Sequence, residues 1–142
     1  MDTIRIGERV YEVISFTSRI TNRSMPTNGI SLAGGYIAVS GSENAYRIFN
    51  TRSGEPILRC RFRSLSDAIK FAEWIEKVYA DYFEIWQDYP KADIISWCKY
   101  TVPNGIDIFG AIEVLNTKDV ISLGDVKEAV EKTRKEENHW KH

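Results

Sequence analysis

Residues 57–67 read ILRCRFRSLSD, and within this stretch the chain changes from a strand pattern to the start of a helix. Three apolar residues alternate with three arginines, as on a strand that has one apolar and one polar face. Ser64 then offers a side-chain oxygen to cap a helix, and Asp67 places a negative charge in its first turn. The stretch therefore predicts an α+β protein with a β-rich part, residues 1–63, followed by a mainly helical part, residues 64–142.

Residues 1–63 predict an antiparallel β-meander. Weak alternation at residues 3–6 and 9–16 indicates a first hairpin, and short strands are expected at 30–33 and 36–40. A last hairpin is expected around Arg52-Ser53-Gly54, with Thr51 paired to Glu55, because only this register brings the apolar faces of its two strands together. Its opposite face is then solvent-facing and collects Ala45, Arg47, Phe49, Ile57, Arg59, Arg61 and Arg63.

The segment between the first two hairpins is polar. Nine of the seventeen residues from Ser15 to Ser31 are Ser, Thr or Asn, and Pro26 interrupts them. This composition predicts a long loop, of the kind that is more often functional than merely connecting. Arg19 and Arg23 lie in it and are expected to reach the same ligand as the arginines of the last hairpin.

The helical part should pack as one layer on this meander. A helix is expected from about Asp67 to Asp88, and its apolar residues cover roughly half of its circumference, which is wider than one sheet requires. We therefore expect a second contact, with the C-terminal segment, a second subunit or a ligand cleft. A short helix after Pro90, a strand over 106–114 and a last helix over about 125–137 complete the predicted domain. The residues expected at a subunit interface are Phe71, Trp74, Val78, Tyr82, Ile85 and Trp86.

Length and composition predict a single soluble domain, residues 1–142, with a mobile C-terminal end. The net charge is −1, but residues 1–63 hold nine arginines, no lysine and five acids, whereas the remainder is acidic. No apolar run is long enough to span a bilayer, and no signal peptide is expected. Cys60 and Cys98 fit neither a disulfide framework nor a metal site, so we expect a cytoplasmic protein that has no metal and no cofactor.

Catalytic motifs are missing from the sequence. His139 and His142 are the only histidines and lie in a charged tail, which argues against a histidine base or a Ser-His-Asp arrangement. The glycines of LAGGYIAVSG, residues 32–41, are not followed by Lys-Ser/Thr or by a helix, so they favour a strand connection over a phosphate-binding loop. The acidic residues show no paired spacing. We expect a protein that is not an enzyme.

The arginines support three hypotheses beside the simple one, in which each arginine pairs with a nearby acid such as Glu43 or Glu55. The first is a binder of single-stranded DNA or RNA, with Arg47, Arg59, Arg61, Arg63, Arg19 and Arg23 on phosphates and Phe49 beneath a base. The second is a protein-interaction module, such as a small viral or mobile-element regulator, that docks on an acidic partner. The third is a binder of nucleotides or other small anions.

The order of the predicted elements, with the RCRFR strand beside an aromatic helix, resembles the single-stranded DNA-binding proteins of thermophilic archaea of the ThermoDBP type. The resemblance implies a small α+β domain with an apolar cleft flanked by basic residues, followed by helical elements that form a homo-oligomer. It is a resemblance of architecture, and no residue role is carried over from that family.

Overall fold

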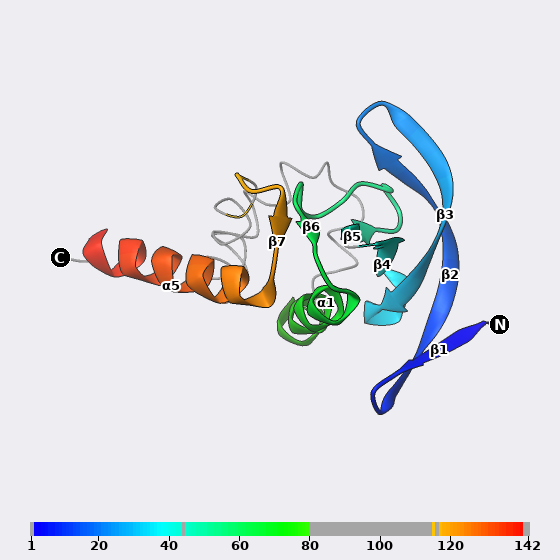
Figure 1. Cartoon of the computed structure of the whole chain (residues 1–142), viewed down its shortest axis with the longest axis horizontal. Coiled ribbons are helices and arrows are strands. Elements are labelled where there is room, and N and C mark those ends of the chain that lie inside the picture. The colour runs from blue at the N-terminus through cyan, green and yellow to red at the C-terminus, as the bar shows by residue number, and fades with distance from the viewer. Residues whose placement is uncertain (1, 44, 80–114, 116, 141–142) are drawn as a thin grey trace.

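The computed structural model describes residues 2–43, 45–79, 115 and 117–140 (Figure 1). Its helices are α1, Leu65–Tyr79, and α5, Leu123–Trp140, and a short 3-10 turn, η1, covers Ala33–Gly35. Its strands are β1 Thr3–Ile6, β2 Arg9–Ile20, β3 Arg23–Leu32, β4 Ile37–Ser42, β5 Ala45–Asn50, β6 Arg61–Phe62 and β7 Val120–Ile121.

The seven strands form one sheet in chain order. Each strand from β1 to β5 pairs antiparallel with the next, and β7 joins β6 in parallel. The α+β class and the antiparallel meander are therefore confirmed. No helix in the described ranges is long and apolar enough to cross a membrane.

One face of the sheet packs on α1 and forms the main core. Phe62 of β6 is fully buried, and its ring lies 5.5 Å from that of Phe71 on α1. Tyr46 stands opposite Phe62 in the sheet, so the two side chains share this face. Arg47 and Arg61 occupy the neighbouring positions of these two strands. Their side chains must then point to the other face, away from α1. Other members of the core are Leu32, Ile37, Val39, Ile48, Ala72 and Ile75.

The sheet is curled, so that its second face also contains buried residues. The N–H of Arg19 on β2 donates to the carbonyl of Gly54 in the β5–β6 connection at 2.7 Å, which closes the curl. Phe49 is enclosed by this curvature, is only 3% exposed, and lies 5.3 Å from the ring of Phe16. The expectation that Phe49 faces solvent is wrong, because it assumes a flat open sheet. Ile57 is also buried, but in the main core, because it pairs with Ile48 rather than lying on the face of the arginines.

The predicted long loop is instead the most extended hairpin of the molecule. β2 and β3 pair continuously from Val13–Ile30 to Ile20–Arg23 and form the long curved ribbon at one side of Figure 1. The prediction was wrong because the covered face of the outer ribbon carries polar residues such as Ser18 and Thr27, whose hydroxyls hydrogen-bond each other at 2.7 Å. Its sequence therefore lacks the apolar alternation that reveals a half-buried strand. Among the described strands, β4 pairs with β3 only at residues 30–32, so Pro26 lies on an edge.

The β5–β6 connection corrects the predicted register. The N–H of Asn50 donates to the carbonyl of Glu55, so the loop covers residues 51–54 and the predicted Thr51–Glu55 pair is wrong. Phe49 pairs with Pro56, and Tyr46 pairs with Phe62. These two pairs are three positions apart along β5 but six positions apart along the segment that follows the loop. The N–H of Ile57 still donates to the carbonyl of Ile48 at 2.8 Å, so residues 58–60 bulge out of the ladder, and Arg59 is not opposite Arg47. Gly54 has the left-handed conformation that glycine favours in such turns, with φ +78°.

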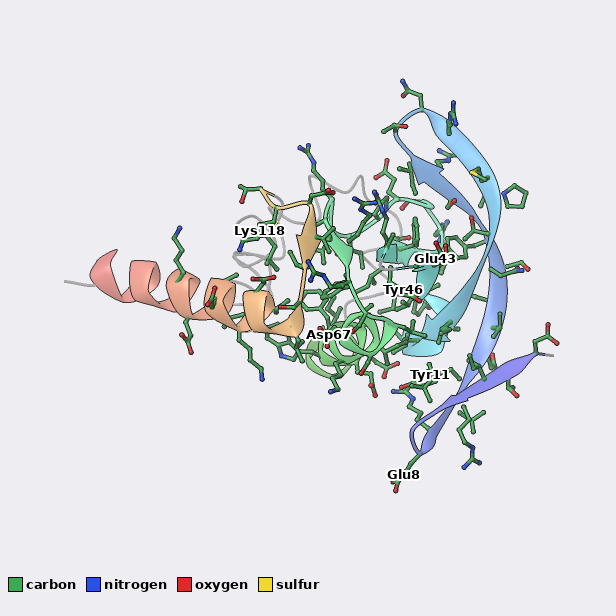
Figure 2. All side chains as sticks on the ribbon, viewed as in Figure 1. Glu8, Tyr11, Glu43, Tyr46, Asp67 and Lys118 are labelled. Atoms are coloured by element: carbon green, nitrogen blue, oxygen red, sulfur yellow. The ribbon has the colours of Figure 1, made fainter. Side chains whose placement is uncertain are left out.

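The parallel strands β6 and β7 lead into helices that begin in the same way. Residues 64–67 read SLSD and residues 122–125 read SLGD. In each, the serine hydroxyl accepts the N–H of the aspartate three residues later, at 3.1 Å in α1 and 3.3 Å in α5. Asp125 also accepts the N–H of Ser122, which lowers its pKa. Asp67 instead reaches across to the N–H of Leu123 at 3.0 Å, so it lies between the two helix starts (Figure 2).

A charged cluster fastens the first hairpin to α1. Arg9 of β2 contacts Glu73 at 3.1 Å and Glu76 at 2.9 Å, and its guanidinium lies 4.7 Å above the ring of Tyr11. Glu76 also accepts the backbone N–H of Ala33. Burial raises the pKa of Glu76, but the hydrogen bonds from Arg9 and Ala33 outweigh it, so the pKa lies below its ordinary value.

Some of the remaining predictions concern described residues and can be compared with the structure, whereas the rest concern residues outside the described ranges. The first hairpin, closed at Ile6–Arg9, and the last helix, with Val126, Ala129 and Val130 buried, are confirmed. Of the helix expected over about 67–88, the structure shows the part up to Tyr79. The end of that helix, the short helix after Pro90 and the strand over 106–114 lie outside the described residues.

We predict that three Gly→Ala substitutions will differ in how much they lower the free energy of unfolding. The order should follow the backbone φ of each glycine and the space around it. At Gly54 a Cβ would lie 2.1 Å from the carbonyl oxygen of Thr17, so G54A should destabilise the protein by about 2 kcal/mol or more. G7A has positive φ but open space, and should cost about 1 kcal/mol. G124A, in the first turn of α5, should be neutral or slightly stabilising. Urea unfolding checks the order, and equal effects at Gly54 and Gly7 would contradict the closure of the sheet there.

We predict that Glu76 contributes acid-sensitive stability. Because its folded pKa is lower than its unfolded pKa, the contribution is present above about pH 4.5 and is lost as pH falls through the folded pKa. E76Q should lower the free energy of unfolding by about 1–2 kcal/mol at pH 7 and by much less at pH 3. Chemical denaturation at both pH values measures the difference. E12Q, at an exposed position on β2, is the control and should change neither value.

Candidate functional site

Two arginines lie side by side on the sheet face that points away from α1. Arg47 comes from β5 and Arg61 from β6, at neighbouring positions of the two strands. Arg47 is half-buried, and the charge of Arg61 acts on it directly. The sequence prediction that guanidinium groups from adjacent strands share a face therefore holds for this pair, but with Arg61 rather than Arg59 beside Arg47.

Among the described residues, one carboxylate accompanies the pair. Asp119, next to β7, accepts hydrogen bonds from one terminal nitrogen of Arg61 at 2.9 Å and 3.0 Å. The backbones are paired as well, because the N–H of Arg61 donates to the carbonyl of Asp119 at 2.8 Å. The Asp119 side chain is 80% exposed, so water competes for it and the ion pair adds little stability. The Nε of Arg61 is buried and has no hydrogen-bond partner.

Arg47, Arg61 and Asp119 together carry a net positive charge. Burial lowers the pKa of Arg47, and the positive charge of Arg61 lowers it further, while Asp119 acts in the opposite direction. The guanidinium group of Arg47 makes no hydrogen bond or ion pair within the described part of the chain. Two cations thus share one carboxylate, and Arg61 retains an unused donor. We call Arg47, Arg61 and Asp119 the arginine pair site.

The other predicted arginines take different places. The N–H of Arg63 donates to Ile121, which continues the parallel ladder, so Arg63 extends the face of Arg61 and is exposed. Arg59 is exposed on the bulged segment outside the strands. Arg19 and Arg23 are exposed near the tip of the β2–β3 hairpin, where the register places them on opposite faces of the ribbon. These two therefore do not form one binding face together.

Comparison with known proteins assigns no family to this arrangement. No family model, curated protein or solved structure matches the chain.

The predicted apolar site residues are mostly enclosed. Phe49 is buried against Phe16, and Phe71 is fully buried between Phe62 and Trp74. Trp74 is half-buried. The side chain of Val78, together with Tyr82, Ile85 and Trp86, lies outside the described residues, so self-association through this helix remains a prediction.

Two features of the site were missed at the sequence level. Asp119 is 58 positions from Arg61, and only the short parallel strand β7 brings it close. The second feature is visible in the sequence itself, because no acidic residue lies between Glu12 and Glu43, a range that includes the whole exposed half of the β2–β3 hairpin. The described residues contain no group of three or more His, Cys, Asp or Glu arranged for a metal ion.

We predict that the arginine pair site is under electrostatic strain which an anion relieves. R47M removes the half-buried cation next to Arg61, so its melting temperature should equal or exceed that of the wild type at low salt. Sulfate at matched ionic strength should stabilise the wild type more than R47M, because it binds only the folded pair. Thermal melts in sodium chloride and sodium sulfate measure both effects. A melting temperature of R47M several degrees below the wild type would show instead that Arg47 is structural.

Proposed function

We propose that this protein is a non-enzymatic, cytoplasmic nucleic-acid-binding protein that holds the sugar-phosphate backbone of a single strand. The observation that carries the proposal is the arginine pair site, where Arg47 and Arg61 lie together and, among the described residues, Asp119 alone offsets them. A phosphate at this place would relieve the repulsion between the two guanidinium groups. Arg63 continues the same face and would contact the next phosphate along the strand.

The chemistry of the pair suits a phosphate oxygen. Each guanidinium carries a planar fork of donors that pairs with phosphate at two points. Arg47 is half-buried, so the attraction is less screened than at a fully exposed arginine. Both features favour binding of an external anion at the pair. A second carboxylate of the protein would have to come from elsewhere in the chain.

The β2–β3 hairpin would provide further contacts to the same strand. Its outer half carries the exposed Arg19 on one face and the exposed Arg23 on the other, and it has no acid to repel a phosphate. Ser and Asn side chains along it add hydrogen-bond donors. Because Phe49 is buried, the proposal relies on backbone contacts rather than on stacking of a base at that residue. Binding should therefore depend weakly on base sequence.

We predict that a labelled single-stranded oligonucleotide binds with an affinity that falls linearly on a log–log plot against salt. The triple variant R47Q/R61Q/R63Q should bind at least about tenfold more weakly at low salt, and its slope should be shallower by about 2. Fluorescence anisotropy from low to moderate salt gives both quantities. R5Q, on β1 at the other end of the sheet, is the matched control and should behave as the wild type.

D119N tests the role of the carboxylate in the opposite direction. Removing its charge leaves both arginines for the phosphate, so binding should become tighter, whereas the melting temperature should change little because Asp119 is exposed. Weaker binding by D119N would contradict the proposal. Tighter binding of a duplex than of a single strand would overturn the preference for one strand, and binding of acidic peptides alone would favour a protein partner.

A further inference from the structure

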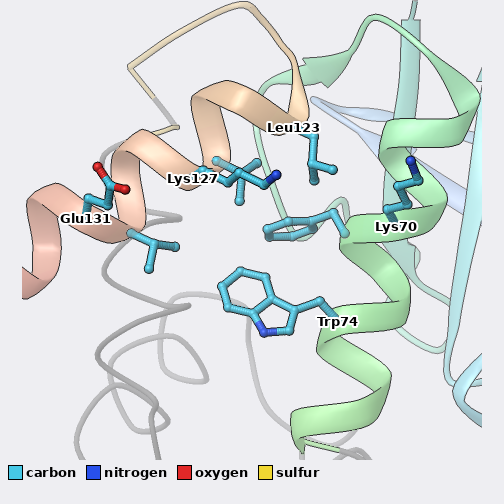
Figure 3. Close-up of a pocket in the computed structure, with 8 residues that line it drawn as sticks. Lys70, Trp74, Leu123, Lys127 and Glu131 are labelled. Atoms are coloured by element: carbon cyan, nitrogen blue, oxygen red, sulfur yellow. The ribbon is translucent and has the colours of Figure 1, made fainter.

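A groove of about 380 Å³ separates α1 from α5, on the helical side of the molecule. Trp74 from α1 and Leu123 and Lys127 from α5 point into the space between the two helices (Figure 3). The lining residues are Lys70, Phe71, Trp74, Leu123, Val126, Lys127, Val130 and Glu131.

The inner surface of this groove is apolar and rigidly held. Phe71 and Val126 are buried in the core beneath it, and the ring of Trp74 stands edge-on to Phe71 with centroids 5.8 Å apart. The two helix starts are joined through Asp67 and Leu123, which fixes the distance between the walls at that end. A space of this size lies within the range of about 300–1,000 Å³ that small-molecule sites occupy.

The rim supplies the polar part of the site. Lys70 and Lys127 are both exposed, and neither forms an ion pair within the described residues. Glu131 also lines the groove, one helical turn beyond Lys127, but it pairs with neither lysine there. The rim therefore carries two ammonium groups against one carboxylate beside an apolar floor, a combination that complements a molecule with an apolar body and one negative head.

We infer that the α1–α5 groove binds a small amphipathic anion, of the fatty-acid type. Its hydrocarbon part lies against Trp74, Val126 and Val130, and its carboxylate lies at Lys70 and Lys127. Neutral apolar molecules would leave the two ammonium groups without a partner. The site lies on the helical side of the sheet, whereas the arginine pair site lies on the other face, so this inference does not depend on nucleic-acid binding.

Isothermal titration with decanoate, kept below its micelle concentration, tests the inference, with decanol as the neutral probe of the same chain length. Decanoate should bind at one molecule per chain and at least about tenfold more tightly than decanol. K70Q/K127Q should remove most of this difference and leave decanol binding unchanged. Lys132 is exposed on the same helix but does not line the groove, so K132Q is the matched control.

A second variant locates the site independently of charge. V130W places a large side chain in the groove, and it should abolish binding of both probes while the circular dichroism spectrum stays that of a folded protein. Absence of saturable decanoate binding, equal affinity of the wild type and K70Q/K127Q, or undiminished binding by folded V130W would each overturn the inference. If V130W does not fold, the comparison of the lysine variants, whose substitutions are at exposed positions, decides alone.

Discussion

The parallel pairing of β6 with β7 is the contact on which the rest of the structure depends. It joins two residue pairs, Arg61 with Val120 and Phe62 with Ile121, and it places the chain after each strand at the start of a helix. The same pairing sets Asp119 beside Arg61, Asp67 beside Leu123, and α5 beside α1. Both candidate sites therefore arise from one short ladder: the arginine pair site on one face of the sheet and the groove between the helices on the other.

The matching caps of the two helices explain why a ladder of only two residue pairs is enough to hold the two helix starts together. Each strand passes within two residues into a serine that caps the following helix, so the backbone donors at both helix starts are satisfied as soon as the strands meet. The carboxylates of Asp67 and Asp125 also occupy the positive ends of these helices. These helix starts are therefore already neutralised by the protein's own carboxylates, and both proposed anion sites use side-chain cations instead.

Much of this fold was predictable from local sequence, and the failures have a common cause. The first hairpin, the start of α1 and the course of α5 follow from turn residues, caps and apolar spacing, all of which act over a few residues. The curl of the sheet, the bulge at residues 58–60 and strand β7 depend on contacts between distant segments. Arginine alternation therefore identified a cationic face correctly at Arg47 and Arg61, but it could not show that Phe49 is enclosed or that Asp119 is the carboxylate nearby.

The position of Pro26 has a consequence for the hairpin as a whole. An exposed ribbon that leaves backbone donors and acceptors along its margin invites other chains to add strands, which is the first step toward fibrous aggregates. Proline has no N–H to offer, and at this margin it interrupts the row of donors without disturbing the pairing with β2. The ribbon can thus remain long and solvated in a crowded solution, and any molecule that recognises it must do so through its side chains.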